Sequence, residues 1–352
     1  MKGRIALVIG SVLFSLVLLE LGCRIARGPE WLVQWPNIIL QDRLRTQRDV
    51  VGRTIHDPRL GFVGRPDYAS SDGRLHYDAR GFRVTPAPDG IALARPPILV
   101  LGDSYAHGDE VTDQETWAAK LQSLTGRAVV NAALSGYGLD QMVLRAEIVA
   151  PEIKPSAIVL SFIADDVRRT EMKRLWGAEK PYFEWVDGAL ALRNTPVPLP
   201  PSPADSLSVP QRLFGRSVLV DTVLRHQGWQ YEWAIDHVRV LSDAEGERQL
   251  CPLMRRLATL GVPTLVVAEY DPYLWQDADY APLVHRVTGL VLKCAEAAGL
   301  ATLDLFPTID AAVRSQGLRS VYADAHPSPV GTAIAARRIA DALKAHQMPP
   351  PQ

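Results

Sequence analysis

Ser104 is the residue in this sequence best placed to act as a nucleophile. It ends a Gly-Asp-Ser segment that follows the branched apolar run 98–101, and Gly108 comes four residues later. This pattern predicts a buried strand that ends in a sharp turn, with the Ser104 hydroxyl at the edge of a sheet. A serine hydroxyl is a weak nucleophile at neutral pH. Catalysis would therefore also require a base, a group that orients the base and hydrogen-bond donors for an oxyanion.

The elements that would position Ser104 alternate between strands and helices. The apolar runs predict five strands, at residues 98–101, 128–133, 157–163, 263–269 and 302–305. Thr112 and Glu115 form a capping box that predicts the start of a helix ending at Gly126, and a last helix is predicted from Pro329. This alternation predicts an α/β fold of three α/β/α layers, in which helices cover both faces of a flavodoxin-like parallel sheet.

Three segments precede or interrupt this main domain, which is predicted at residues 96–346. Residues 1–27 are predicted to form a membrane helix, and residues 28–95 an irregular extension, rich in Pro, Gly, Arg and Asp, that packs on the main domain. An insertion at roughly 168–241 separates the third and fourth strands and contains a hairpin predicted to turn at an Asp-Gly pair. Because the insertion leaves the carboxyl end of a central strand, we expect it to help shape the ligand site.

The N-terminus carries an apolar segment at residues 5–19, preceded by Lys2 and Arg4 and interrupted by Glu20. The segment is short for a spanning helix unless it continues past Glu20 toward Ile25, so a signal peptide and a membrane anchor both stay open. No small-x-small cleavage site follows it cleanly, which favours an uncleaved signal anchor, and Glu20 makes a lipoprotein acylated at Cys23 a poor fit. Basic residues flank both ends equally, so charge sets the orientation only weakly. We expect a single-pass protein of the inner membrane whose catalytic domain lies in the periplasm.

Composition excludes some functions. The 352 residues are 47% hydrophobic and 22% charged, with a formal net charge of −1, which describes a globular chain without the basic stripe that nucleic acid requires. The three cysteines, Cys23, Cys251 and Cys294, lack metal-ligand spacing, and no metal or organic cofactor is expected. Oxidising surroundings would permit a disulfide between Cys251 and Cys294, but two buried free cysteines are the preferred interpretation. The sequence does not predict an oligomeric state.

Polar residues follow four of the predicted strands, and the carboxyl ends of parallel strands meet at one edge of a sheet. These residues are Ser104, Gly136, Asp165 and the pair Asp324 and His326. The set resembles the SGNH (GDSL-type) hydrolase superfamily, whose sequence blocks follow one another in the same order. The resemblance covers about residues 96–345, and short segments at 81–83 and 180–183 look like those of membrane-anchored bacterial members.

The resemblance implies a role for each of these residues. Ser104 would be the nucleophile, His326 would take its proton, and Asp324 would fix the imidazole tautomer and stabilise its cation. The last block has an Asp-x-His form that some members, notably alginate-acetylation proteins, use in place of Asp-x-x-His. The backbone N–H groups of Ser104 and Gly136 would bind the oxyanion together with the side chain at the position of Asp165, where the family has asparagine.

The implied activity is that of a serine esterase or O-acyl hydrolase that forms an acyl-enzyme, acting on acylated carbohydrate or another ester of the cell envelope. An O-acyltransferase in polysaccharide modification stays open as an alternative. So does a catalytically weak protein that binds polysaccharide or an assembly partner. An α/β-hydrolase elbow is a poorer match, because Ala106 replaces the second glycine of Gly-x-Ser-x-Gly.

Asp165 is the main departure from the family pattern. A carboxylate repels a developing oxyanion and offers no donor, so it should reduce activity. Either Asp165 stays protonated beside Asp166, since neighbouring like charges raise the pKa of a carboxyl, or the substrate or another donor takes its place. On the oxyanion assignment, Asp165→Asn is predicted to retain or raise esterase activity.

The remaining polar residues near these motifs are given structural roles. Asp103 is predicted to cap the turn and the helix after it, and Asp166 to accept hydrogen bonds from a neighbouring loop. His107 is predicted to lie partly buried at the start of a helix, and His237 and His285 to lie on the surface of helices.

Overall fold

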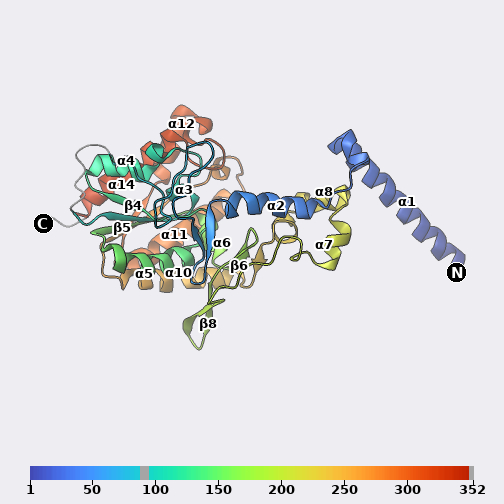
Figure 1. Cartoon of the computed structure of the whole chain (residues 1–352), viewed down its shortest axis with the longest axis horizontal. Coiled ribbons are helices and arrows are strands. Elements are labelled where there is room, and N and C mark those ends of the chain that lie inside the picture. The colour runs from blue at the N-terminus through green and yellow to red at the C-terminus, as the bar shows by residue number, and fades with distance from the viewer. Residues whose placement is uncertain (88–94, 349–352) are drawn as a thin grey trace. The chain divides into compact units, whose positions relative to one another are not determined.

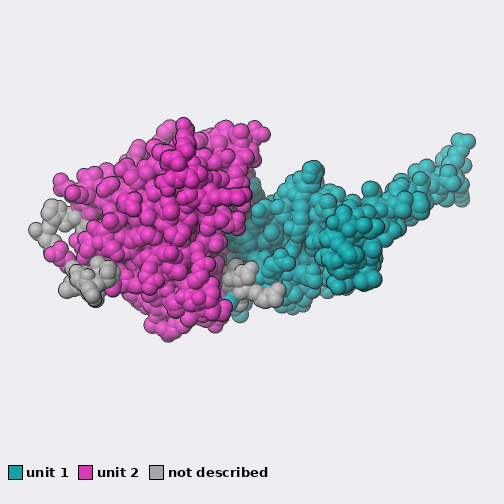
Figure 2. All heavy atoms as spheres, turned by 90° about the horizontal axis from the view of Figure 1, so that it is seen from above, with its two compact units in different colours: residues 1–52, 174–179, 199–239 teal, residues 53–173, 180–198, 240–352 magenta. Residues whose placement is uncertain are grey.

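The computed structural model of the chain describes residues 1–87 and 95–348 (Figure 1). The chain forms two compact units, which Figure 2 shows in different colours. Unit 1 comprises residues 1–52, 174–179 and 199–239, and unit 2 comprises residues 53–173, 180–198 and 240–352. The predicted N-terminal extension and the predicted insertion are therefore each divided between the two units.

A five-stranded parallel sheet forms the centre of unit 2, as the sequence predicts. The strands run in the order β12-β11-β5-β3-β4, and each pairing in the sheet is parallel. Their bounds are β3 (Ile98–Leu101), β4 (Val129–Asn131), β5 (Ala157–Phe162), β11 (Thr264–Ala268) and β12 (Ala301–Asp304). Both β3 and β5 are buried along their whole length, which is why the sequence shows continuous, mainly apolar runs there and not alternation.

Helices cover both faces of this sheet (Figure 1), which confirms the predicted three-layer fold. One layer contains α4 (Trp117–Thr125), α12 (Phe306–Gln316) and α14 (Pro329–Ala345), and the other contains α5 (Leu139–Ile153), α10 (Asp243–Ala258) and α11 (Ala281–Ala297). In the first layer, Trp117 and Ile339 are fully buried in one apolar cluster with Val100 and Val267 of the sheet. Burial of such apolar surface is the main stabilising contribution to a fold of this kind.

Shorter elements connect the layers of unit 2. They are β1 (Thr54–Asp57), β2 (Gly61–Gly64), α3 (Ser104–His107), α6 (Ala164–Arg169), β8 (Tyr182–Val186), β9 (Ala189–Arg193), α13 (Leu318–Val321) and 3₁₀ helices at Asp113–Glu115 and Pro272–Trp275. The predicted capping box of Thr112 and Glu115 opens the first 3₁₀ helix and not α4. Thr116 caps α4 instead, because its hydroxyl accepts a hydrogen bond from the Ala119 N–H at 3.1 Å.

The predicted hairpin is present as β8 and β9, with Asp187 and Gly188 at positive φ in its two-residue turn. Lys180, which precedes β8, attaches the hairpin to α5. Its Nζ lies 2.6 Å from Asp140 Oδ2, and both side chains are fully buried. Burial lowers the pKa of Lys180 and raises that of Asp140, while the opposite charge of each partner acts against these shifts.

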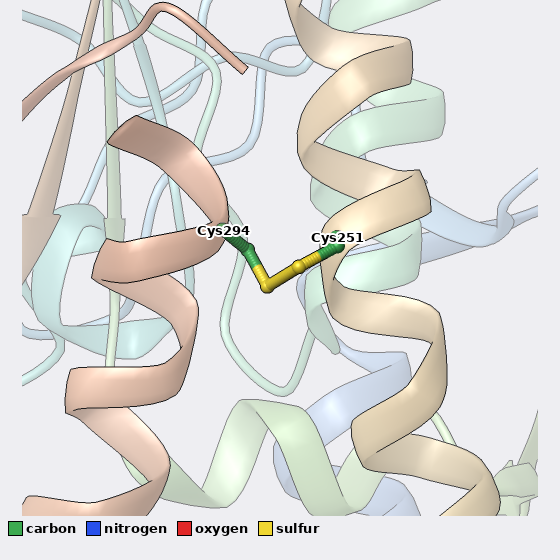
Figure 3. The surroundings of a disulfide bond; sticks show 2 residues. All are labelled: Cys251 and Cys294. Carbon is green, nitrogen blue, oxygen red and sulfur yellow. A yellow bond between two sulfur atoms is a disulfide. The ribbon is translucent and has the colours of Figure 1, made fainter. Parts of the chain in front are cut away.

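Cys251 and Cys294 form a disulfide that joins α10 to α11 (Figure 3). The preferred expectation of two free cysteines is therefore wrong. The two helices pack against each other, and the Cα atoms of the cysteines lie 4.5 Å apart, a separation that a disulfide spans. The sequence places the cysteines on successive helices, but it does not give the rotation of one helix against the other, which decides whether the thiols meet.

Unit 1 is mainly helical. Its elements are α1 (Lys2–Arg27), a 3₁₀ helix at Pro29–Leu32, α2 (Ile38–Val51), β7 (Ala178–Glu179), α7 (Val209–Phe214), α8 (Val218–His226), α9 (Gln230–Trp233) and β10 (Val238–Arg239), and β6 (Met172–Leu175) passes from unit 2 into it. The helix α2 corrects the expectation of an irregular extension. Most of its apolar residues lie at its two ends in the sequence, which therefore lacks helical periodicity there. At the first end, Ile39 is buried with Leu207 and Ala234.

In the described part of the chain, α1 is the one helix long and apolar enough to cross a membrane. Its C-terminal turns are held by other parts of unit 1. The Glu20 carboxylate accepts hydrogen bonds from the Val218 and Leu219 N–H groups, in the first turn of α8, at 3.0 and 2.9 Å. The Arg24 side chain is fully buried and donates to three backbone carbonyls of unit 1. The C-terminal end of α1 is thus part of the folded unit.

Candidate active site

Ser104 is the first residue of α3 and follows the turn that ends β3. Asp103 caps this short helix, as predicted, by accepting a hydrogen bond from the Tyr105 N–H at 2.9 Å. Gly102 has a φ of 158°, and a Cβ atom there would lie 2.8 Å from Ser161 O in β5. Only glycine therefore permits the close approach of backbones that places Ser104 at the sheet edge.

His326 reaches Ser104 from a hairpin loop far along the chain. Its Nε2 lies 2.9 Å from Ser104 Oγ, which is a hydrogen-bond distance. The loop is closed by a hydrogen bond from the Ala323 N–H to His326 O at 3.0 Å, and the Tyr105 hydroxyl fixes it by donating to Ala325 O at 2.6 Å. A neutral imidazole in this position can accept the proton of the Ser104 hydroxyl.

Asp324 does not take part in this contact. It lies at the exposed tip of the same loop, beyond the antiparallel pairing of Tyr322 with Pro327. Within the described residues, no hydrogen bond or ion pair joins the Asp324 carboxylate to His326, whose Nδ1 is buried and has no hydrogen-bond partner. The structure thus brings two of the three predicted catalytic residues together and leaves the third in solvent.

The loop after β4 carries Gly136, the second predicted source of an oxyanion N–H. Gly136 has a φ of 83°, in the left-handed region that glycine favours. Two residues earlier, the Leu134 N–H donates to Gly102 O at 3.1 Å, so this loop runs beside the turn that carries Ser104. The Ser104 and Gly136 backbones therefore lie on adjacent loops at the carboxyl edge of the sheet.

Asp165, in the first turn of α6, is ionised and paired. Its carboxylate accepts hydrogen bonds from Arg168 Nε at 2.7 Å and from Arg169 Nε at 3.0 Å. Burial alone would raise the pKa of Asp165, but the charges of Arg169 and Arg168 outweigh burial and hold that pKa below its usual value. The suggestion that Asp165 stays protonated beside Asp166 is therefore wrong, because two arginines stabilise the carboxylate.

Arg169, which no sequence motif marks as functional, joins three loops of the site. Its guanidinium lies 2.6 Å from Asp166 Oδ1 and 3.8 Å from Asp103 Oδ2, and it donates to Tyr137 O at 3.1 Å. Asp166 also accepts from the Ile163 N–H at 2.9 Å, which confirms its predicted role as a structural acceptor. Burial raises the pKa of both Asp103 and Asp166, and the Arg169 charge opposes that rise. In the sequence, the one feature that points to Arg169 is its position three residues after Asp166 and four after Asp165, a spacing that places side chains on the same face of a helix.

Two histidines differ from their predicted surroundings. His107, expected to be partly buried, is fully buried and forms hydrogen bonds with the Tyr77 hydroxyl at 2.8 Å and with the Asp109 carboxylate. Burial lowers the pKa of His107 to about 4, so this histidine is neutral at physiological pH. His237, expected on a helix surface, is buried just before β10, whereas His285 is exposed on α11 as expected. In the described ranges, no group of three or more His, Cys, Asp or Glu side chains has a metal-binding arrangement.

A three-layer α/β/α domain with a serine after its first strand and a histidine on a late loop is typical of the SGNH hydrolases. Comparison of the sequence with models of protein families identifies the family. Residues 100–334 match the GDSL-like lipase/acylhydrolase family, and because the match covers more than half of the chain, this protein belongs to that family. No curated protein matches the chain.

Similar solved structures include three enzymes. An α/β-hydrolase enzyme from the metagenome of Lake Arreo, Spain, has 16% identity and a TM-score of 0.45, over 72% of this chain and 98% of that chain. The acetylxylan esterase Axe2 of Geobacillus stearothermophilus has 15% identity and a TM-score of 0.45, over 74% and 96%. The psychrotrophic esterase EstA of Pseudoalteromonas sp. has 14% identity and a TM-score of 0.41, over 72% and 98%. Similarity at this level does not extend to substrates.

Proposed function

We propose that this protein is a serine esterase that removes acyl groups through an acyl-enzyme on Ser104. The distance of 2.9 Å between His326 Nε2 and Ser104 Oγ carries the proposal, because it joins a nucleophile directly to a base. Membership of the GDSL-like lipase/acylhydrolase family supports ester hydrolysis as the class of reaction. The proposed substrates are acylated carbohydrates or other envelope esters, the class that the family resemblance implies.

The reaction would proceed in two acyl-transfer steps. Ser104 Oγ attacks the ester carbonyl carbon while His326 Nε2 takes the hydroxyl proton, which gives a tetrahedral oxyanion. The oxyanion collapses to the acyl-enzyme, and His326 gives its proton to the alcohol that leaves. Water then attacks the acyl-enzyme with His326 as base, and departure of the carboxylic acid restores the Ser104 hydroxyl. An acceptor alcohol in place of water would make the same site a transferase.

The backbone N–H groups of Ser104 and Gly136 are the proposed donors to the oxyanion. The side chain of Asp165 is proposed to lie near the same charge, where its carboxylate would oppose the reaction. Arg168 and Arg169 reduce that cost, because they hold the carboxylate in hydrogen bonds and balance its charge.

Asp165→Asn is expected to retain or raise kcat. The amide keeps the size of the side chain, removes the negative charge and adds a donor. One oxyanion donor is worth about 10²- to 10³-fold in kcat, which sets the scale of the gain from the added donor. Initial rates with nitrophenyl acetate measure the effect. A lower kcat at an unchanged melting temperature would show that Asp165 does not act at the oxyanion.

A fluorophosphonate probe tests the proposed function, because it reacts with an activated serine. Labelling of the wild-type protein but not of Ser104→Ala supports an enzyme, whereas an unlabelled wild-type protein supports a binding protein. If the wild-type protein reacts with the probe, fresh protein that has not been exposed to the probe is then incubated with an acylated sugar and an excess of unacylated acceptor sugar. Release of free acid identifies a hydrolase, and acylated acceptor identifies a transferase.

We also propose that α1 anchors the protein in the inner membrane with the catalytic domain in the periplasm. The disulfide between Cys251 and Cys294 supports an oxidising compartment. The contacts of Glu20 and Arg24 support a retained helix, because cleavage after Arg24 would remove both side chains and leave the groups they bind in the folded unit without these partners. Burying the Arg24 guanidinium is tolerable only while those carbonyls accept its hydrogen bonds.

The full-length chain, with α1 attached, is therefore expected in the membrane fraction. A protein tagged at both ends should give one band that carries both tags and resists alkaline extraction. Protease added to spheroplasts should remove the C-terminal tag. A shorter membrane-free band that carries only the C-terminal tag would contradict retention of α1, and a C-terminal tag protected in intact spheroplasts would contradict the periplasmic placement.

A further inference from the structure

The proposed base lacks the orienting group that a catalytic histidine requires. His326 Nε2 faces Ser104, so the orienting group must act on Nδ1, which is buried and has no hydrogen-bond partner. Asp324 lies at the exposed tip of the loop and makes no contact there. An unpaired Nδ1 leaves the imidazole free to adopt the wrong tautomer or to rotate, and it leaves the imidazolium without a counter-charge.

A different carboxylate lies beside this nitrogen. Glu110 Oε1 is 3.6 Å from His326 Nδ1. Glu110 follows α3, so it belongs to the same segment as the nucleophile and not to the Asp-x-His loop. Its side chain is 38% exposed, which leaves it free to move the few tenths of an ångström that a hydrogen bond still requires. Catalytic hydrogen bonds are often long in a free enzyme and tighten when substrate binds.

The backbone on both sides of Glu110 is held firmly. The buried Arg83 guanidinium donates to Gly108 O at 3.2 Å and to Val111 O at 2.9 Å. The Arg74 guanidinium donates to the carbonyl of Glu110 itself. Hydrogen bonds to charged donors are stronger than neutral ones, so these three contacts fix the path of the loop.

The neighbouring residue sets the direction in which Glu110 can act. The Asp109 side chain pairs with Arg53 at 3.2 Å, and it forms hydrogen bonds with the buried His107 and with the Ser135 hydroxyl. These contacts of Asp109 hold the loop. The residue that follows Asp109 is Glu110, and its side chain is the one that lies beside His326. The arginines that hold the loop all come from residues 53–83, a segment to which the sequence assigned no function.

We propose that Glu110, and not Asp324, is the positioning residue that orients His326 and stabilises its cation. This proposal rests on the proposed function, since it concerns the base of the same reaction. During attack, the Glu110 carboxylate accepts a hydrogen bond from His326 Nδ1–H, which leaves Nε2 free to take the Ser104 proton. The catalytic triad would then consist of Ser104, His326 and Glu110, two of which lie in the same segment of the chain.

Glu110→Gln tests this proposal against Asp324→Asn in the full-length protein. Because an orienting carboxylate acts on the chemical step, Glu110→Gln is expected to lower kcat by about 10²- to 10⁴-fold with little change in KM, whereas Asp324→Asn should lose less than about fivefold. Glu110→Asp, which keeps the charge, should recover part of the loss. Glu247→Gln, at a surface ion pair with Arg286, is the matched control and should behave as wild type.

Each outcome separates this proposal from the proposed function. Suppose that the wild-type protein reacts with fluorophosphonate, that Asp324→Asn loses its esterase activity and that Glu110→Gln does not. This result would overturn the role of Glu110 and leave the proposed esterase function intact. A wild-type protein that neither reacts with the probe nor hydrolyses esters would instead overturn the proposed function. A loss in Glu110→Gln that appears as a lower melting temperature or a higher KM, without recovery in Glu110→Asp, would identify a merely structural residue and contradict the proposal.

Discussion

Ser104→Ala is expected to abolish esterase activity, with a fall in kcat of about 10⁶-fold, the loss that follows removal of the nucleophile from a serine hydrolase. The fold should not change, because the hydrogen bonds of the Ser104 hydroxyl within the described residues are those with His326 at 2.9 Å and Asp103 at 3.4 Å, and neither joins layers of the fold. Steady-state rates with nitrophenyl acetate, fluorophosphonate labelling and a melting curve measure the three effects. The variant should be inactive, unlabelled and as stable as wild type.

The control for this prediction is Ser123→Ala, since this serine is exposed and its hydroxyl donates a hydrogen bond to Ala119 O within α4. It should leave kcat and labelling unchanged. His326→Ala should lose about as much activity as Ser104→Ala, and the double variant no more than either, because nucleophile and base act as one unit. Retention of activity or labelling in Ser104→Ala would place the reactive serine elsewhere in the chain.

Lys180→Met is expected to lower the free energy of unfolding by about 3–5 kcal/mol, because it leaves the fully buried carboxylate of Asp140 without its charged partner. The paired ions lie 2.6 Å apart between the start of β8 and α5. Equilibrium unfolding in urea measures the difference. Lys180→Met combined with Asp140→Leu should recover most of the loss, because replacing both buried ions with apolar groups removes the unpaired charge.

Arg193→Met on the same hairpin is the matched control. Arg193 and Glu184 form an ion pair 2.8 Å apart, but each side chain is 44% exposed. Water already solvates such a pair, so its loss should lower the free energy of unfolding by no more than about 1 kcal/mol. Equal costs for the two variants would show that the Lys180 pair is not buried in solution.

Much of the fold could be predicted because its strands carry a local signal. The run at β3 is buried along its whole length, and such continuous burial is typical of a parallel sheet covered by helices. The helix α2 could not be predicted in this way, since its middle is polar and Ile39, at its first end, packs on residues more than a hundred positions away. The disulfide depended likewise on how α10 and α11 pack, which is a long-range property.

The candidate site shows the same difference between features that the sequence predicts and features that depend on long-range packing. Ser104 directly follows β3, whereas α12 and α13 separate His326 from β12. The order of the family's sequence blocks, and not topology alone, therefore predicts that they meet, and their contact is present. On the proposed role of Glu110, spacing in the sequence is a poor guide to the orienting carboxylate. Asp324 is two residues from His326 yet lies at a loop tip, while Glu110 approaches Nδ1 through a loop whose path depends on distant arginines. Such a position is set by charge pairing across the fold and leaves no motif.

Arg53, Arg74 and Arg83, the three arginines that hold the loop around Glu110, also affect where the catalytic region begins. The family match starts at residue 100, after all three arginines. A soluble fragment cut at that boundary would contain the serine and the histidine but would release the loop between Gly108 and Val111. Fragments prepared for assays or crystals therefore have to start no later than Arg53, and the conventional domain boundary is a poor guide to the smallest active piece of this chain.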